Sequence, residues 1–213
     1  MIDILIPVYY RPHQIARLYE NITNSTKEPH QICFIIESKD IKTLNECLKL
    51  GNKVRVIQGN FDSYCNAMNT GYFLTQNEFV FTGVDDLEMT FDWDVAVMQE
   101  LYQGDVHVVG SKCIGADLPP EGHCGSYFTI RRSWVEKHSL VSGMPNLLFY
   151  PYYHHEADRE LMYRAKDYGV YRPCPESIIK HCQVFDEVQK KTVSKDLIDR
   201  DTYWNRRHLF RGA

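Results

Sequence analysis

The chain has 213 residues, of which 44% are hydrophobic and 24% are charged, and its formal net charge is -4. This length allows one well-filled core, and the composition is ordinary for a globular protein. The acidic balance argues against a protein that holds nucleic acid through a broad basic surface, although a local basic patch is compatible with it. We therefore expect a single domain over residues 1–213.

The sequence has no run of the ~18 consecutive apolar residues that a membrane span requires. The amino terminus places Asp3 where a secretory signal would carry basic residues, and its apolar run stops at Pro7. These features predict a cytoplasmic protein without a membrane span. The seven cysteines are scattered and never spaced as C-x-x-C, so most of them should be reduced and buried.

Strands and helices alternate over the first hundred residues. Apolar runs predict strands, apolar residues at helical spacing predict helices, and a proline or glycine marks several ends. In chain order we expect a strand at 2–8, a helix at 13–25, a strand at 31–36, a helix at 44–50, a strand at 54–57, a helix at 64–74 and a strand at 79–81. This alternation is typical of an α/β fold with a mostly parallel central sheet flanked by helices.

The second half of the chain is less regular. We expect strands at 106–109 and 127–131, a flexible loop at 119–125 and a helix at 157–169.

Polar clusters follow three of the predicted strands, at Pro7 to Tyr9, Glu37 to Asp40 and Thr82 to Asp86. Ligands of parallel α/β sheets bind at the carboxyl ends of the strands, because loops converge there. The site is expected where these three clusters meet.

Asp85 and Asp86 come directly after a buried apolar strand. Two carboxylates at the edge of a core need a partner, and Mg²⁺ or Mn²⁺ is a suitable one, with open positions for the oxygens of a diphosphate. A solvated turn or a helix N-cap explains the same pair without any ligand. Spacing alone does not separate these interpretations.

Four segments together resemble the family 2 glycosyltransferases of the GT-A fold. They are Ile4 to Tyr9, Ile35 to Glu37, Asn66 to Gly71 and Phe81 to Asp86, and their order and spacing agree over residues 2–100. The resemblance implies a single Rossmann-like domain. Residues 1–100 would bind a nucleotide sugar, residues 101–185 would bind the acceptor and supply the catalytic group, and residues 186–213 would form a basic, aromatic tail.

The resemblance also implies roles for individual residues in the first half. Pro7 and Tyr9 would border the nucleobase, Glu37 would contact the base or the ribose, and Asn66 and Asn69 would line the donor pocket.

The acidic pair falls on the family's DxD-type motif, whose carboxylates contact the donor ribose and the metal. The form Val84-Asp85-Asp86-Leu87 departs from the commonest motif, so either carboxylate can be the direct metal ligand. His181 matches a histidine that completes the metal site in many GT-A enzymes, and an imidazole beside carboxylates favours Mn²⁺ over Mg²⁺. The pair His154-His155 competes for this role, and a histidine after a strand is often structural.

Residues 157–164 are similar to the family's ED-x-(D/E)-L-x-x-R helix, in which the aspartate is the general base. The resemblance implies that Asp158 takes the proton of the acceptor hydroxyl in an inverting transfer, and a helix start would keep it ionised. Ala157 replaces the usual first acid, for which Glu156 could compensate. Without the resemblance, Asp158 would be an N-cap and Glu160-Arg164 a surface ion pair.

The carboxyl-terminal tail is basic and aromatic. Its residues of these types are Lys190, Lys191, Lys195, Arg200, Tyr203, Trp204, Arg206, Arg207, Phe210 and Arg211. Such a pattern can contact a diphosphate or a nucleic-acid backbone, and solvated helix faces have the same composition.

The small size, the missing anchor and the form Gly-Val-Asp-Asp-Leu resemble phage-encoded members of the family, some of which glycosylate hydroxymethylated bases in DNA. That acceptor predicts a basic groove formed by the tail and the pair Arg131-Arg132. A phage-encoded protein would act in the host cytoplasm.

The expected activity is therefore hexosyl transfer from a nucleoside diphosphate sugar, with UDP as the expected nucleotide, to an acceptor hydroxyl. A modified base in phage DNA, an envelope saccharide and a protein side chain all remain open as acceptors. A nucleotidyltransferase would show an early glycine-rich phosphate loop, and residues 7–12 contain no glycine. A non-enzymatic alternative is a nucleotide-sugar or nucleic-acid binding module without transfer activity. The replacement of the usual first acid of the motif by Ala157 favours this alternative.

Overall fold

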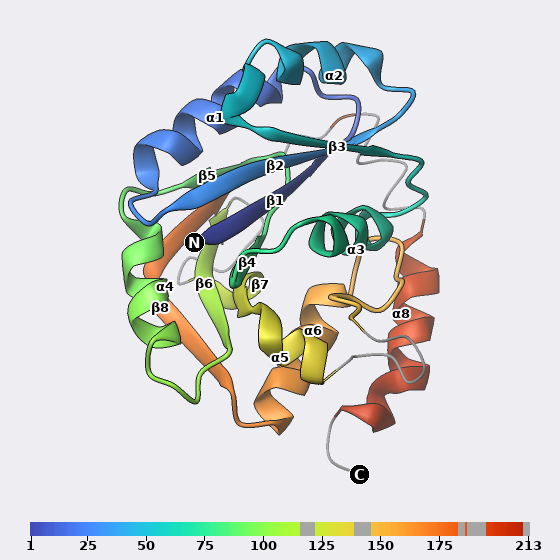
Figure 1. Cartoon of the computed structure of the whole chain (residues 1–213). Helices are drawn as coiled ribbons and strands as arrows, with labels where there is room; N and C mark the ends of the chain where they lie inside the picture. Colours follow the sequence, from blue (N-terminus) through green and yellow to red (C-terminus); the bar gives the residue numbers. More distant parts are fainter. Residues whose placement is uncertain (116–121, 139–145, 183–185, 187–194, 211–213) are drawn as a thin grey trace.

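One eight-stranded sheet, in the order β3-β2-β1-β4-β7-β6-β8-β5, organises the part of the chain that the structure describes. This computed structural model describes residues 1–115, 122–138, 146–182, 186 and 195–210 (Figure 1). The strands are β1 (Ile2–Val8), β2 (His30–Glu37), β3 (Arg55–Gly59), β4 (Phe79–Thr82), β5 (Leu87–Met89), β6 (Val108–Gly115), β7 (His123–Arg131) and β8 (Tyr171–His181). The mostly parallel sheet and its helices form a single α/β domain, as predicted.

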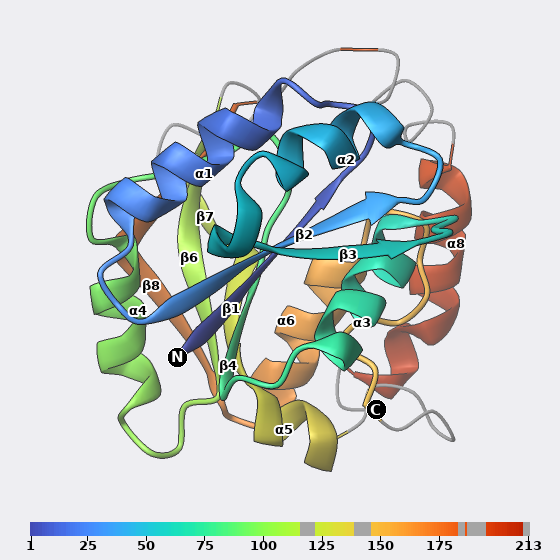
Figure 2. The same cartoon turned by 45° about the horizontal axis from the view of Figure 1, so that its top comes forward.

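Helices cover both faces of the sheet (Figures 1 and 2). They are α1 (Gln14–Ser25), α2 (Ile41–Leu48), α3 (Tyr64–Leu74), α4 (Trp93–Leu101), α5 (Arg132–Lys137), α6 (Ala157–Asp167) and α8 (Asp196–Arg206), with short 3-10 turns at Gly51–Lys53 and Arg207–Leu209. Helices α1, α2 and α4 share one hydrophobic cluster with the sheet, and α3, α5, α6 and α8 share the other.

The strand β1 shows why the sheet must be covered on both sides. Ile4 and Ile6 are fully buried in the cluster beneath α1, whereas Leu5 is fully buried in the cluster beneath α3. Side chains alternate between the two faces of a strand, so a strand that is apolar at nearly every position belongs in the middle of a three-layer fold. This confirms the interpretation of the first apolar run.

The three predicted polar clusters lie at the same edge of the sheet. β1 runs parallel to β2 on one side and to β4 on the other, so the carboxyl ends of all three strands meet. The strands and helices predicted for residues 2–81 are all present. The largest shift is at α2, which begins at Ile41 rather than at residue 44, because the Asp40 side chain accepts a hydrogen bond from Thr43 N and caps the helix.

The chain after residue 81 contains elements that were not predicted, notably β5, α4, α5, β8 and α8. β8 pairs parallel with β6 and antiparallel with β5, with a register shift at Ser111 and Lys112. Pro173 and Pro175 lie within β8, and proline cannot donate to a strand ladder. The two prolines therefore concealed a strand that carries His181.

Among the described residues, no helix is long and apolar enough to cross a membrane. All seven cysteines are free; five are buried, Cys124 is half-buried and Cys182 is exposed. The predicted loop at 119–125 is wrong for residues 123–125, which pair in the sheet as the start of β7, while residues 119–121 lie outside the described residues. Lys190, Lys191 and Arg211 also lie outside them.

Candidate active site

The acidic turn, Asp85-Asp86, follows β4 through a tight approach at Gly83. A Cβ atom at Gly83 would lie 2.3 Å from Ile6 Cδ1, so a larger residue here would require the Ile6 side chain to shift. Arg17 from α1 donates hydrogen bonds to the carbonyl oxygens of Asp85 (3.0 Å) and Leu87 (2.9 Å). Contacts with β1 and α1 thus fix the backbone of the turn without a bound ligand.

Within the turn, Asp85 is paired with Arg11. The Asp85 Oδ1 atom lies 2.5 Å from Arg11 Nη1, and both residues are buried. Arg11 also donates two hydrogen bonds of 2.8 Å to the carboxylate of Asp186. Burial raises the pKa of Asp85 to about 6, although the charge of Arg11 acts in the opposite direction. Sequence reasoning missed Arg11, since an arginine before Pro12 in a turn matches no motif.

Asp86 faces His181 instead. Its Oδ1 atom lies 3.2 Å from His181 Nε2, because β5 and β8 pair antiparallel with Leu87 opposite His181. The Asp86 carbonyl also accepts a hydrogen bond of 2.7 Å from Cys182 N. Burial disfavours the charge on Asp86, but the hydrogen bond and charge of His181 outweigh it and lower the pKa of Asp86.

The predicted metal ligands therefore have different main partners, although Arg11 Nη1 also lies 3.9 Å from Asp86 Oδ2. Among the described residues, no three His, Cys, Asp or Glu side chains lie close enough together to hold an ion. Asp86 and His181 nevertheless offer a carboxylate oxygen and an imidazole nitrogen at one point, a donor set that suits Mn²⁺ and leaves positions for diphosphate oxygens. The residues present fit a divalent ion at Asp86 and His181, while Asp85 is engaged by Arg11.

The competing histidines have other contacts. The ring of His154 lies 5.4 Å from the ring of Tyr64 and 4.7 Å from that of His155, and burial lowers the pKa of His154 to about 4. His155 Nε2 lies 2.8 Å from Asp196 Oδ1. Of the three candidate histidines, His181 is the one that contacts an acid of the turn.

Two of the predicted donor-binding residues line the converging strand ends. Tyr9 is 42% exposed, and its backbone N lies 3.5 Å from Asp85 Oδ2. Glu37 accepts a hydrogen bond of 2.8 Å from Phe61 N, which fixes its carboxylate beside the end of β3. Pro7 is half-buried and lies on β1 opposite Ile35 of β2.

The predicted asparagines on α3 differ from each other. Asn66 is exposed near the start of the helix, where its backbone N is capped by Ser63. Asn69 is engaged through both ends of its amide, since Nδ2 donates to Phe149 O and Oδ1 accepts from Phe149 N, each at 2.9 Å. Its contacts assign Asn69 to holding the segment before α6.

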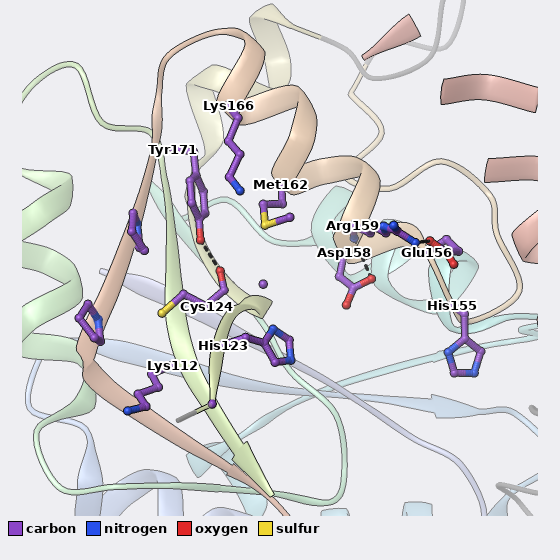
Figure 3. A pocket seen from close by; sticks show the side chains of 14 residues that line it. Lys112, His123, Cys124, His155, Glu156, Asp158, Arg159, Met162, Lys166 and Tyr171 are labelled. Atoms are coloured by element: carbon purple, nitrogen blue, oxygen red, sulfur yellow. Dashed lines mark hydrogen bonds and ion pairs between the residues drawn. The ribbon is translucent and has the colours of Figure 1, made fainter. Parts of the chain in front are cut away.

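Asp158 lies in the first turn of α6 and points into a cavity (Figure 3). Burial raises the pKa of Asp158 to about 6, against the hydrogen bond of 2.8 Å that it accepts from Arg159 N. The helix start was expected to keep this carboxylate ionised, but desolvation is the stronger effect, so ionisation requires a pH above about 6. Ala157 is buried in the core, and the Glu156 carboxylate pairs with Arg159 at 3.2 Å.

Asp158 and Asp86 both influence two side chains of the sheet. Burial raises the pKa of the Cys113 thiol on β6 to about 12, with smaller contributions from the charges of Asp158 and Asp86. Burial also raises the pKa of Tyr127 on β7, and both carboxylates add to this effect; the ring centroid of Tyr127 lies 6.3 Å from that of His181. Asp86 and His181 do not line the cavity that Asp158 faces.

Glu160 is a buried structural residue and not part of a surface pair. Its carboxylate accepts hydrogen bonds from Tyr152 (2.5 Å), Arg164 (2.7 Å) and Arg206 (2.8 Å), and its side chain is 2% exposed. This network joins α6 to α8. The surface interpretation of Glu160-Arg164 is therefore wrong.

The aromatic residues of the tail also belong to the fold. Tyr203 is fully buried and Phe210 is 2% exposed, both in the cluster with α3 and α6. Only Trp204 of the three is substantially exposed, at 48%, with Arg207 over its ring. Tyr203 and Phe210 therefore extend the hydrophobic cluster that α3 and α6 form with the sheet.

The arginines proposed for a basic groove form ion pairs elsewhere. Arg131 pairs with Glu78, and Arg132 pairs with the buried Asp3 at 3.2 Å while donating to the carbonyl oxygens of Asn77 and Tyr72. In the described part of the chain, these residues hold β7 and α5 against the rest of the fold.

Comparisons with known proteins agree with this geometry. The family model described as Glycosyl transferase family 2 matches residues 3–122. A search of curated proteins gave no match.

Two similar solved structures were determined with ligands. A mannosyltransferase, PcManGT from Pyrobaculum calidifontis, in complex with GDP-Man and Mn²⁺, has a TM-score of 0.67 and 13% identity over 96% of this chain and 64% of its own. Glucosyl-3-phosphoglycerate synthase from Mycobacterium tuberculosis, in complex with Mn²⁺, UDP and glucosyl-3-phosphoglycerate, has a TM-score of 0.64 and 13% identity over 93% and 79% of the two chains.

A third similar structure is that of S. aureus TarS, with a TM-score of 0.68 and 14% identity over 90% of this chain and 38% of its own. The chain thus spans less than two thirds of the mannosyltransferase and less than half of TarS. At such low identity these structures establish a shared fold, which is that of GT-A glycosyltransferases. With a family model that covers more than half of its length, this chain belongs to glycosyl transferase family 2.

Proposed function

We propose that the protein transfers a sugar from a UDP-sugar to an acceptor hydroxyl with inversion, and that it requires Mn²⁺ or Mg²⁺. The observation that carries this proposal is the contact between Asp86 and His181 at the carboxyl edge of the sheet. A carboxylate and an imidazole at the end of a parallel sheet suit a divalent ion that binds a diphosphate.

Each residue would have a separate role. Asp86 and His181 would hold the ion, which stabilises the negative charge of the leaving diphosphate when bound. Asp85, fixed by Arg11, would accept hydrogen bonds from the donor ribose. Tyr9 and Glu37 would border the base, at the neighbouring ends of β1 and β2.

The transfer itself would begin at Asp158. The acceptor hydroxyl oxygen forms a bond to the anomeric carbon while its proton passes to Asp158. The bond between the anomeric carbon and the diphosphate oxygen breaks, and the nucleoside diphosphate leaves with the electron pair. Attack and departure on opposite faces of the sugar invert the anomeric centre.

The ligands of the similar structures support this choice of donor and ion. The mannosyltransferase is in complex with GDP-Man and Mn²⁺, one TarS structure is in complex with UDP-GlcNAc, and the glucosyl-3-phosphoglycerate synthase is in complex with Mn²⁺ and UDP. UDP thus occurs in two of these enzymes and GDP in one. A panel of donors must include both nucleotides.

Two acceptors follow from the sequence, a hydroxymethylated base in phage DNA and an envelope saccharide. The DNA acceptor requires a basic groove, yet Arg131, Arg132 and Arg206 are held in ion pairs with Glu78, Asp3 and Glu160. The described residues therefore favour the saccharide. The phage origin and the cytoplasmic location remain predictions.

The proposal is tested by donor turnover. The protein is incubated with UDP- and GDP-sugars, with Mn²⁺, with Mg²⁺ or with EDTA, and the released nucleoside diphosphate is measured. We expect slow hydrolysis of at least one donor in the presence of Mn²⁺ and none with EDTA. If no donor shows metal-dependent binding or hydrolysis, the proposal is wrong and the chain is better described as a binding module.

A further inference from the structure

Asp40 is a buried residue whose carboxylate accepts hydrogen bonds from two separate segments of the chain. The residue is 2% exposed. Its Oδ1 atom accepts a hydrogen bond from Thr43 N at 3.2 Å, and its Oδ2 atom accepts one from Tyr10 N at 2.7 Å. A carboxylate that is taken out of water needs such bonds, because burial of an unpaired charge is costly. Each oxygen of Asp40 thus has a backbone N–H as its partner.

The helix cap alone does not explain an aspartate at this position. The bond from Thr43 N caps α2, and serine, threonine or asparagine would accept that bond about as well. The bond from Tyr10 N does not belong to the helix, because Tyr10 lies 30 residues earlier, in the turn between β1 and α1. A carboxylate has a second oxygen for this bond, whereas a serine hydroxyl has only one oxygen.

The backbone of Tyr10 has a conformation that residues other than glycine adopt at a cost. Its φ is +54°, in the left-handed region. Its side chain is 46% exposed, and its ring meets the ring of Tyr9 edge-on, with 4.6 Å between the centroids. A residue stays in this region where its surroundings hold it there. The hydrogen bond from Tyr10 N to the buried Asp40 is a contact of this kind.

The conformation of Tyr10 determines how its two neighbours lie relative to each other. Tyr9 is 42% exposed at the end of β1, whereas Arg11 is 6% exposed and reaches Asp85. The φ and ψ angles of one residue set the directions of the chain on both sides, because the peptide units beside it are planar. A change at Tyr10 would therefore move Tyr9 relative to Arg11, which the ion pair with Asp85 holds in place.

Asp40 is also bonded to the segment that carries Glu37. β1 and β2 lie side by side (Figure 1), and their pairing ends at Val8 and Ile36. Beyond that point Asp40 N donates a hydrogen bond of 2.9 Å to Glu37 O, while its carboxylate accepts the bond from Tyr10 N. Asp40 therefore connects the two strand ends where the strand ladder no longer does.

We propose that Asp40 is a positioning residue of the donor site. Through its bonds to the backbone of Tyr10 and of Glu37, it fixes the two walls of the base pocket relative to each other. This inference rests on the proposed function, in which Tyr9 and Glu37 border the base. Asp40 is itself buried, so it acts through its neighbours rather than by contact with the nucleotide. A pocket whose walls are already in place loses less conformational entropy on binding, so release of Tyr10 weakens the binding of the nucleotide.

The first test removes the bond to Tyr10 and keeps the helix cap. Asp40→Ser retains a hydroxyl oxygen for Thr43 N, but this short side chain lacks the second oxygen that reaches Tyr10 N. The dissociation constant of UDP is measured by calorimetry in the presence of Mn²⁺, at a temperature at which the variant is folded. We expect UDP to bind the variant about 10-fold more weakly than the wild type, because Tyr10 then leaves the left-handed region in most molecules.

The second test shows whether the effect passes through the backbone of Tyr10. Glycine adopts a positive φ readily, whereas alanine incurs a left-handed cost as tyrosine does. Tyr10→Gly and Tyr10→Ala both remove the ring, so a comparison within each background cancels its loss. Asp40→Ser should weaken UDP binding about 10-fold in the Tyr10→Ala background and no more than about 3-fold in the Tyr10→Gly background. An equal effect in the two backgrounds would overturn the inference, because a general loss of structure does not depend on the conformational freedom of residue 10.

A matched control removes a carboxylate from the same helix. Glu46 pairs with Lys49 on the surface of α2, and Glu46→Ser should leave the affinity for UDP unchanged. If the wild type binds UDP and Asp40→Ser binds it equally well, the inference is wrong and the proposed function stands. If the wild type binds neither UDP nor GDP, the proposed function is wrong and the inference fails with it.

Discussion

Arg11 and Asp85 form a buried ion pair, with 2.5 Å between Arg11 Nη1 and Asp85 Oδ1. Because Arg11 also binds Asp186, one guanidinium joins the acidic turn to a residue that follows β8. The guanidinium of Arg11 thus links the turn after β4 to Asp186.

Replacing Arg11 by Met should be strongly destabilising. The substitution leaves the buried Asp85 carboxylate without its partner, which typically costs about 3 kcal/mol or more of the free energy of unfolding. Urea unfolding measures this loss. The double variant Arg11→Met/Asp85→Asn should recover part of it, because the uncompensated charge is then absent.

The control for Arg11 is an exposed pair. Lys27 Nζ lies 2.5 Å from Asp92 Oδ2, yet the lysine side chain is 56% exposed. Lys27→Met should change the free energy of unfolding by about 0.5 kcal/mol at most. A similar cost for Arg11→Met and Lys27→Met would contradict the structural role of the Arg11 pair.

Asp158→Asn should abolish transfer while donor binding is retained. Because the base must be ionised and its pKa is raised to about 6, the wild-type transfer rate should rise with pH up to about 6 and then level off. A pH profile of transfer, measured beside donor affinity, tests this. A rate that is independent of pH between 5 and 7, or retained transfer in the Asn variant, would reject Asp158 as the base.

The Asp158→Asn variant should also differ from the wild type in the free energy of unfolding. A carboxyl whose folded pKa lies above its unfolded value contributes stability below the unfolded pKa, near 3.9, and loses it as the pH rises through about 6. Asp158→Asn removes that loss, so at pH 8 the variant should be more stable than the wild type by on the order of 1 kcal/mol. The difference should vanish near pH 4.

Glu160→Ala should loosen the contact between α6 and α8. It removes the acceptor shared by Tyr152, Arg164 and Arg206, and leaving half-buried arginines unpaired costs about 3 kcal/mol. These partners lower the pKa of Glu160 despite its burial, so their contribution is present above the ordinary glutamate pKa, near 4.3, and is lost as the pH falls through the lowered pKa.

Hydrogen exchange of α8 measures the effect of Glu160→Ala directly. Glu46→Ala is the control, because Glu46 forms an exposed pair with Lys49 on α2. Faster exchange confined to α8 and α6 is expected for Glu160→Ala alone. Unchanged protection of α8 would mean that apolar contacts of Tyr203 and Phe210 hold the helix by themselves.

The first half of the fold was predictable because burial on both faces leaves an unambiguous pattern. Strand β1 is apolar at nearly every position, and the helices beside it keep their apolar residues at helical spacing. β8 was missed because two prolines and several polar residues disguise it, and β5 because it is only three residues long. Both strands form through pairing with strands that are far away in the sequence.

The residues of the candidate site also fall into two groups, those that a local sequence pattern predicts and those that it does not. The acidic turn and Asp158 lie in local patterns that match a family motif, so the sequence alone pointed to them. Arg11 belongs to no motif, and its contact with Asp85 appears only when the carboxyl ends of β1 and β4 meet. The tail was misinterpreted because the sequence cannot distinguish a buried Tyr203 from an exposed one.

The most direct test of the account is the Mn²⁺ dependence of donor hydrolysis in the wild type and in Asp86→Asn. Asp86 contacts His181 and would be a direct ligand, so its loss should raise the Mn²⁺ concentration for half-maximal hydrolysis at least ~10-fold. The exposed Asp105→Asn should leave that concentration unchanged. Hydrolysis that is equal with Mn²⁺ and with EDTA, or an Asp86→Asn variant with the wild-type Mn²⁺ requirement, would contradict a metal site at Asp86 and His181.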